Sequence, residues 1–198
     1  MTNTIRIATA AYPLDGLETW TDYAAKQIAW VREAANAGAD LLVFPEYGRM
    51  DLAALSGDAG DLEASLHAAH ALAEDADALM ADLAQGYGVH ILCPSGPVFD
   101  EGSDRPVNRT WLIGPDGPLD PTDKQVMTRF ERETWNVVPG DPLQVIDTPL
   151  GKIGVLICYD SEFPLLGRAL IEQGAEILLI PSCTDTLRGY HRVRIAAQ

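Results

Sequence analysis

Short apolar runs alternate with longer amphipathic stretches along the chain, which is the pattern of an α/β protein. Buried strands are predicted where apolar runs lie between turn-forming residues. These runs cover residues 5–12, 40–44, 89–94, 109–114, 143–148, 152–159 and 176–180. Helices are predicted where apolar side chains recur at helical spacing. They cover residues 19–37, 62–85 and 164–174, whereas residues 120–140 show a less regular pattern.

Two joints between a helix and a strand share one sequence pattern. Residues 38–46 read GADLLVFPE and residues 174–182 read GAEILLIPS. Each has a glycine, a small residue, an acid, four apolar residues, a proline and a polar residue. Any two joints of this kind resemble each other, so the match can be trivial. The alternative is that two equivalent α/β units pack in one domain.

Composition narrows the class of protein. With 198 residues, 47% hydrophobic and 22% charged, the chain is expected to form a single globular domain over residues 1–198. A net charge of −15 disfavours nucleic-acid binding, which needs a basic surface. No apolar run reaches the roughly 18 residues that cross a membrane, and the first residues lack the features of a signal peptide. A cytoplasmic location is therefore expected.

The ends of the predicted strands hold the candidate chemistry, because ligands of α/β sheets bind at the carboxyl ends of strands. Glu46 follows one apolar run, and Cys158 lies near the end of another. Cys158 is either a small core residue or a nucleophile for acyl transfer, and a nucleophilic thiol needs a base. No histidine is an obvious base, so Glu46 is the candidate. The three cysteines, Cys93, Cys158 and Cys183, have no metal-type spacing and predict no disulfide framework.

A thiol beside a carboxylate is poorly activated, because a neighbouring negative charge raises the pKa of the thiol. Such a site needs a cation. Lys124 follows a strand and a turn and can supply it, and the helix predicted to begin at Pro164 adds the positive end of its dipole. Taken alone, Lys124 is equally compatible with an ordinary surface lysine.

Three motifs occur together and in order: FPEYG around Glu46, DKQVMTRFERETW followed by PG around Lys124, and ICYDSEFP around Cys158. In this the sequence resembles the nitrilase (carbon–nitrogen hydrolase) superfamily over the whole chain. The resemblance implies a four-layer α-β-β-α sandwich and a Glu-Lys-Cys triad. It also implies no metal or organic cofactor, and commonly a homodimer.

Residue roles follow from the same resemblance. Cys158 is expected to form a thioester, and Glu46 to move protons to and from the thiol, the leaving nitrogen and water. Lys124 is expected to stabilise the oxyanion with the backbone N–H of Tyr159. A second glutamate after the lysine positions the substrate nitrogen or the lysine. Glu133 is the preferred candidate and Glu131 the alternative. Cys93 and Cys183 are expected to be buried and to have no catalytic role.

The expected activity is hydrolysis of a non-peptide C–N bond in a small amide or carbamoyl compound, with a nitrile as the less favoured substrate. Family members continue well beyond the position of Gln198, so the C-terminal part of the sandwich is expected to be missing. Two alternatives stay open. The chain is either an inactive relative that only packs against a partner, or a domain that supplies ammonia or acyl groups to a larger enzyme.

Overall fold

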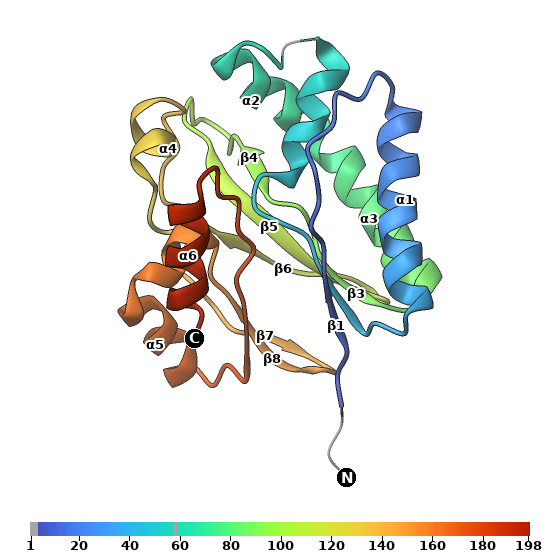
Figure 1. The fold of residues 1–198 in the computed structure, drawn as a ribbon, viewed down its shortest axis with the longest axis vertical. Helices are drawn as coiled ribbons and strands as arrows, with labels where there is room; N and C mark the ends of the chain where they lie inside the picture. Colours follow the sequence, from blue (N-terminus) through green and yellow to red (C-terminus); the bar gives the residue numbers. More distant parts are fainter. Residues whose placement is uncertain (1–3, 58) are drawn as a thin grey trace.

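The computed structural model describes residues 4–57 and 59–198 (Figure 1). No signal peptide is expected at the start of the chain, and residues 1–3 of that stretch lie outside the described residues. The strands are β1 (Ile7–Thr9), β2 (Leu41–Val43), β3 (His90–Leu92), β4 (Gly96–Val98), β5 (Val107–Gly114), β6 (Gly117–Asp123), β7 (Ile146–Thr148), β8 (Gly151–Val155) and β9 (Ile177–Leu179). The helices are α1 (Trp20–Asn36), α2 (Leu62–Ala71), α3 (Ala73–Tyr87), α4 (Arg129–Glu133), α5 (Pro164–Glu172) and α6 (Leu187–Ala196). Two 3-10 helices, η1 (Gly48–Ser56) and η2 (Cys158–Glu162), follow the ends of strands.

The strands of the described residues form two sheets. The first sheet has the order β1-β2-β3-β5-β4, and β6 pairs with β5. Its strands β1, β2 and β3 are parallel, whereas β5 is antiparallel to β3, β4 and β6. The second sheet has the order β7-β8-β9, with β7 antiparallel and β9 parallel to β8. Both sheets therefore contain parallel strands whose carboxyl ends lie at one edge, where the site is found below.

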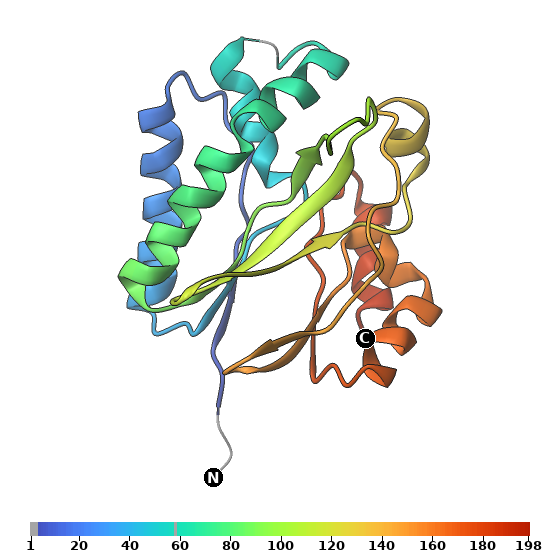
Figure 2. The same ribbon diagram turned by 180° about the vertical axis from the view of Figure 1, so that it is seen from behind.

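The two sheets face each other, and helices cover their outer faces (Figures 1 and 2). Alternate residues of one strand enter different cores, because side chains of a strand point to opposite faces. In β2, Leu42 packs with α1 and α3, whereas Leu41 and Val43 pack against Ile153 and Val155 of β8. A further core lies between the second sheet and α5. The order of layers is α-β-β-α, which confirms the predicted four-layer sandwich.

One helix and one strand differ clearly from the sequence-based prediction. The helix predicted over residues 62–85 is two helices, because Leu72 leaves the helical conformation with φ −107° and ψ 8°. The two helices then pack on different partners, α2 on η1 and β4, and α3 on β5. Strand β6 lies partly in the less regular region and contains Pro118 and Pro121, which disfavour a strand prediction. The two prolines are tolerated because β6 pairs on one side with β5.

The two matching joints have equivalent hydrogen bonds. In the first, the Asp40 N–H donates to the Arg6 carbonyl at 2.8 Å, and the Arg6 N–H donates to the Asp40 carboxylate at 2.8 Å. In the second, the Glu176 N–H donates to the Lys152 carbonyl at 2.8 Å, and the Lys152 N–H donates to the Glu176 carboxylate at 2.9 Å. The shared pattern thus corresponds to two similar β-α-β units, one in each sheet.

Helices long and apolar enough to cross a lipid bilayer are absent from the described residues.

Candidate active site

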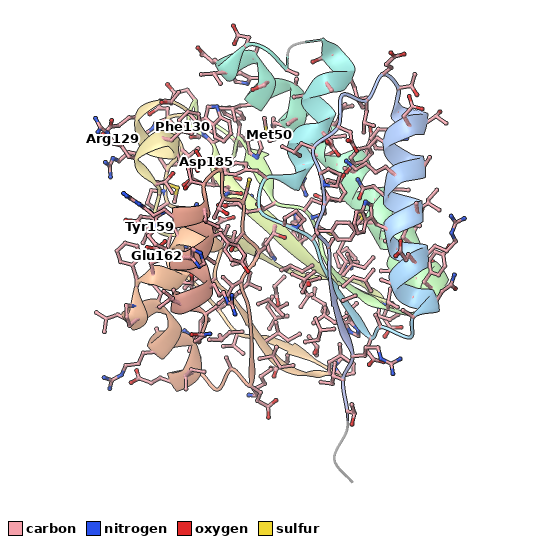
Figure 3. All side chains as sticks on the ribbon, in the orientation of Figure 1. Met50, Arg129, Phe130, Tyr159, Glu162 and Asp185 are labelled. Carbon is pink, nitrogen blue, oxygen red and sulfur yellow. The ribbon has the colours of Figure 1, made fainter. Side chains whose placement is uncertain are left out.

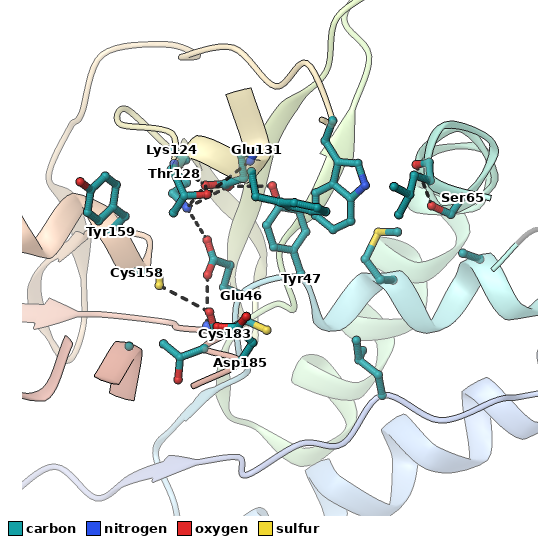
Figure 4. A pocket seen from close by; sticks show the side chains of 18 of the residues that line it. Glu46, Tyr47, Ser65, Lys124, Thr128, Glu131, Cys158, Tyr159, Cys183 and Asp185 are labelled. Carbon is teal, nitrogen blue, oxygen red and sulfur yellow. Dashed lines mark hydrogen bonds and ion pairs between the residues drawn. The ribbon is translucent and has the colours of Figure 1, made fainter. Parts of the chain in front are cut away.

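A cavity of about 1020 Å³ opens where strands of both sheets end. Its wall includes Met50, Phe130 and Tyr159, which are labelled in Figure 3. Glu46, Lys124 and Cys158 also line it, and Figure 4 shows them together at close range. Three positions far apart in the sequence therefore meet in one cavity, as the motifs predict.

Glu46 lies after β2 and is held at both carboxylate oxygens. Its side chain is buried, with 3% exposed. Oε1 accepts hydrogen bonds from Lys124 Nζ at 2.6 Å and Asn108 Nδ2 at 3.3 Å, and Oε2 accepts one from the Cys183 N–H at 3.1 Å. Burial raises the pKa of Glu46, and the positive charge of Lys124 offsets only part of that shift. A buried carboxylate with a raised pKa is suited to accept and return a proton.

Lys124 directly follows β6 and lies between two carboxylates. Its ammonium donates to Glu46 at 2.6 Å and to both oxygens of Glu131, at 2.8 and 2.7 Å. Burial alone would lower the pKa of Lys124, but the charges of Glu46 and Glu131 outweigh it and raise the pKa. The lysine is therefore a fixed positive charge in the cavity.

Cys158 begins η2 in a left-handed backbone conformation, with φ 50°. This conformation is unusual for a residue other than glycine and makes a sharp turn after β8. Burial, followed by the charge of Glu46, raises the pKa of the Cys158 thiol to about 12. The thiol donates to the Cys183 carbonyl, 3.8 Å from Sγ, and Glu46 lines the same cavity. At neutral pH the sulfur is therefore protonated and has a base beside it.

The second glutamate beside the lysine is Glu131, whereas the preferred candidate from the sequence is Glu133. Glu131 is buried, and its carboxylate also accepts a hydrogen bond from the Tyr47 hydroxyl at 2.8 Å. Glu133 is two residues further along α4, points to the surface and pairs with Arg129 at 2.7 Å. Helix geometry explains the difference, because positions two apart in a helix face different directions. The position of Glu131 corrects the preference for Glu133.

The other two cysteines differ from each other. Cys93 is fully buried in the core beneath the first sheet, as expected. Cys183 is exposed and lines the cavity, contrary to the expectation that it is buried. Its backbone contributes to the site, because its N–H donates to Glu46 and its carbonyl lies 3.8 Å from Cys158 Sγ. Cys183 is exposed because it lies in the loop after β9, outside the apolar run of that strand.

Tyr159 is the second residue of η2 and lines the cavity next to Cys158. The first N–H groups of a helix have no acceptor within it, so the Tyr159 N–H is available to a ligand there. Two residues that the sequence analysis does not single out also contact the glutamates, namely Tyr47 and Asn108. Asn108 is a polar residue in a buried strand and Tyr47 directly follows Glu46, which are the signals that point to them.

Among residues 4–57 and 59–198, groups of three or more histidine, cysteine, aspartate or glutamate side chains arranged to hold a metal ion are absent.

Comparison with known proteins identifies the family. Residues 6–196 match the family model described as carbon-nitrogen hydrolase. The chain is 33% identical to the probable hydrolase YhcX of Bacillus subtilis (strain 168) over 194 residues, which are 98% of this chain and 37% of YhcX. It is 27% identical to omega-amidase NIT2-B of Xenopus laevis over 168 residues, 80% of this chain and 57% of that protein.

A solved structure has the same fold. The carbon-nitrogen hydrolase from Helicobacter pylori G27 superposes with a TM-score of 0.75 at 20% identity, covering 97% of this chain and 66% of that one. The chain belongs to the carbon–nitrogen hydrolase family, which confirms the resemblance found in the sequence. It spans about two fifths to three fifths of the length of these two curated relatives.

Proposed function

We propose that this chain hydrolyses the C–N bond of a small non-peptide amide or carbamoyl compound through a thioester on Cys158. The observation that supports this most is the position of the Glu46 carboxylate, which binds the Lys124 ammonium at 2.6 Å and shares one cavity with the Cys158 thiol, whose pKa its charge helps to raise. The name of the related omega-amidase favours an amide over a nitrile as the substrate.

In the first half-reaction, Glu46 takes the thiol proton while Cys158 Sγ attacks the carbonyl carbon. The negative charge that develops on the carbonyl oxygen is stabilised by the Lys124 ammonium and the Tyr159 N–H. Preorganised donors of this kind contribute strongly in a buried site. The C–N bond then breaks, Glu46 returns the proton to the leaving nitrogen, and ammonia or an amine departs from the thioester.

In the second half-reaction, water attacks the thioester carbonyl and gives a proton to Glu46. The C–S bond breaks, the acid leaves, and the proton on Glu46 returns to the sulfur. Glu131 remains ionised throughout, because Lys124 and the surrounding donors outweigh the effect of burial and lower its pKa. Its role is to hold the lysine between the two glutamates.

Ammonia release from a panel of short amides tests this proposal. Cys158→Ala is expected to reduce the rate at least ~10³-fold, because the nucleophile is lost. Cys93→Ala, which removes a thiol from the core, serves as the matched control and is expected to keep most of the activity. Mass spectrometry of the wild type during turnover is expected to find the acyl group on the peptide with Cys158. Ammonia release that survives Cys158→Ala overturns the thioester mechanism.

The homodimer stays a prediction, and light scattering of the purified chain measures it.

A further inference from the structure

Asp160 is a fully buried carboxylate two residues after Cys158. Its Oδ1 accepts hydrogen bonds from the backbone N–H of Val126 at 2.7 Å and of Gln125 at 3.1 Å. Its Oδ2 accepts one from the Ile157 N–H at 3.2 Å. The last of these is the local turn contact that an aspartate makes with its own backbone. The first two reach a segment about 35 residues earlier in the chain.

The two segments that Asp160 connects belong to different sheets. Gln125 directly follows Lys124 at the end of β6, in the first sheet. Ile157 directly precedes Cys158 beyond β8, in the second sheet. The candidate ammonium and the candidate nucleophile therefore lie on opposite layers of the sandwich. A hydrogen-bonded group between these layers, next to both residues, fixes one relative to the other.

We propose that Asp160 is a positioning residue that sets the distance between the Lys124 ammonium and the Cys158 sulfur by binding the backbone on either side. The inference rests on the proposed function of these two groups. Asp160 does not line the cavity, so it acts on the reaction through Lys124 and Cys158 and not by contact with the substrate. Displacement of a catalytic group by about 1 Å can reduce a rate ~10²-fold.

The carboxylate form of Asp160 is the form that suits this task. Burial raises its pKa to about 6, against the effect of the backbone N–H groups and Lys124, so Asp160 is ionised above neutral pH. A carboxylate can accept from all the N–H groups at once, and bonds to a charged acceptor are the stronger kind. An asparagine keeps the shape but directs an NH₂ group at one of the donors. The bridge between the sheets is then incomplete.

The test is the rate at which iodoacetamide alkylates Cys158 near pH 8, determined by peptide mass. Burial and the charge of Glu46 raise the pKa of Cys158, and the charge of Lys124 opposes part of that rise, so moving the lysine away reduces the thiolate fraction. Asp160→Asn is expected to slow alkylation about tenfold, as a change of one pKa unit implies. This measurement needs no substrate, so it separates failure of the inference from failure of the proposed function.

The matched control is Asp77→Asn. Asp77 is a largely buried carboxylate that pairs with Arg49, and burial raises its pKa as it does that of Asp160. The control is expected to lower stability without changing Cys158 alkylation. If both variants slow alkylation equally, the effect is general loss of stability and the inference is wrong.

A double-mutant comparison tests the route of the effect. In a Lys124→Ala background, Asp160→Asn is expected to cause no further loss of alkylation rate, because there is no lysine left to position. Full additivity of the two changes overturns the inference. In amide turnover, a positioning residue that does not touch the substrate is expected to lower kcat with little change in KM.

A measurement on the wild type keeps the inference testable if Asp160→Asn does not fold. The Gln125 and Val126 N–H groups are expected to exchange slowly with deuterium, together with Ile157 N–H, because one carboxylate binds all of them. Exchange of Gln125 and Val126 at the rate of an open loop contradicts the bridge.

Discussion

The β1-α1-β2 unit and the β8-α5-β9 unit are built alike, yet their strand ends hold different chemistry. Ile7 pairs with Leu41 in the first unit as Ile153 pairs with Ile177 in the second. Counted along the strands from these pairs, Tyr12 corresponds to Cys158. Counted in the same way, Glu46 corresponds to Ser182.

The corresponding residues have different surroundings. The Tyr12 hydroxyl donates to Asp51 at 2.5 Å and accepts from Gln27, so the tyrosine is part of a structural network beneath α1. Cys158 instead borders the cavity beside Glu46. The comparison shows that a β-α-β joint sets where a side chain is placed, whereas neighbouring loops determine whether the place is reactive.

Glu46 and Ser182 occupy corresponding positions in the two joints, and substituting each of them separately is expected to give the largest difference in activity. Glu46→Gln is expected to lower amide hydrolysis ~10²- to 10⁴-fold, because the base for the thiol is lost. Ser182→Ala is the matched change in the second joint and is expected to alter the rate less than about twofold, since Ser182 is half-buried and does not line the cavity. The Ser182 hydroxyl donates to the Ile180 carbonyl at 3.2 Å.

Steady-state ammonia release from both variants measures this difference. Equal losses in the two variants would mean that the joints contribute to activity only through stability, and would remove the assignment of Glu46 as the base.

The second prediction uses Asp160, which has Leu14 as its counterpart in the first joint. Burial raises the pKa of Asp160 from the ordinary 3.8 to about 6, so the folded state binds a proton more readily than the unfolded state. This group stabilises the fold most below about pH 4, and the stabilisation is lost as the pH rises through 6. Each pKa unit corresponds to about 1.4 kcal/mol, so the loss is about 3 kcal/mol.

Asp160→Asn removes this titration. The free energy of unfolding of the variant relative to the wild type is therefore expected to rise by about 3 kcal/mol between pH 4 and pH 7. Urea unfolding at several pH values measures it, and Leu14→Ala is the control that has no such dependence. Parallel curves for the wild type and Asp160→Asn would contradict the raised pKa.

Much of the fold could be predicted from the sequence, because the sequence signals for its strands and helices are local. The apolar runs at residues 40–44 and 176–180 each enter a sheet, since four apolar residues between a glycine and a proline suit a buried strand. The break between α2 and α3 at Leu72 could not be predicted, because the helical spacing of apolar residues continues through it. It depends on α2 packing against η1 and β4, which are contacts of the tertiary structure.

The candidate site divides in the same way. Glu46, Lys124 and Cys158 could be selected because each follows an apolar strand or lies in an ordered motif. The preference for Glu133 over Glu131 was wrong about position, because a five-residue helix gives no spacing signal to show which face is buried. The backbone contacts of Cys183 and Asp160 depend on loops from both sheets and have no signal in the sequence.

The smallest expected effect comes from the glycines that begin the two joints. Gly38 and Gly174 have φ of 79° and 99°, so alanine is strained at both positions by ~1 kcal/mol. At Gly38, an added Cβ would also lie 2.3 Å from Nη1 of Arg6, which donates to the Ala37 carbonyl at 2.9 Å. At Gly174, the nearest atom is Cδ of Lys152 at 3.6 Å, an ordinary contact.

Gly38→Ala is therefore expected to destabilise the protein more than Gly174→Ala, by about 0.5–1 kcal/mol, the usual contribution of one hydrogen bond. Urea unfolding of both variants measures the difference. The Arg6→Ala variant supplies the control, because without the guanidinium the two alanine substitutions should have equal effects. An unchanged difference in that background would show that the joints differ in backbone strain and not in the side chain packed on them.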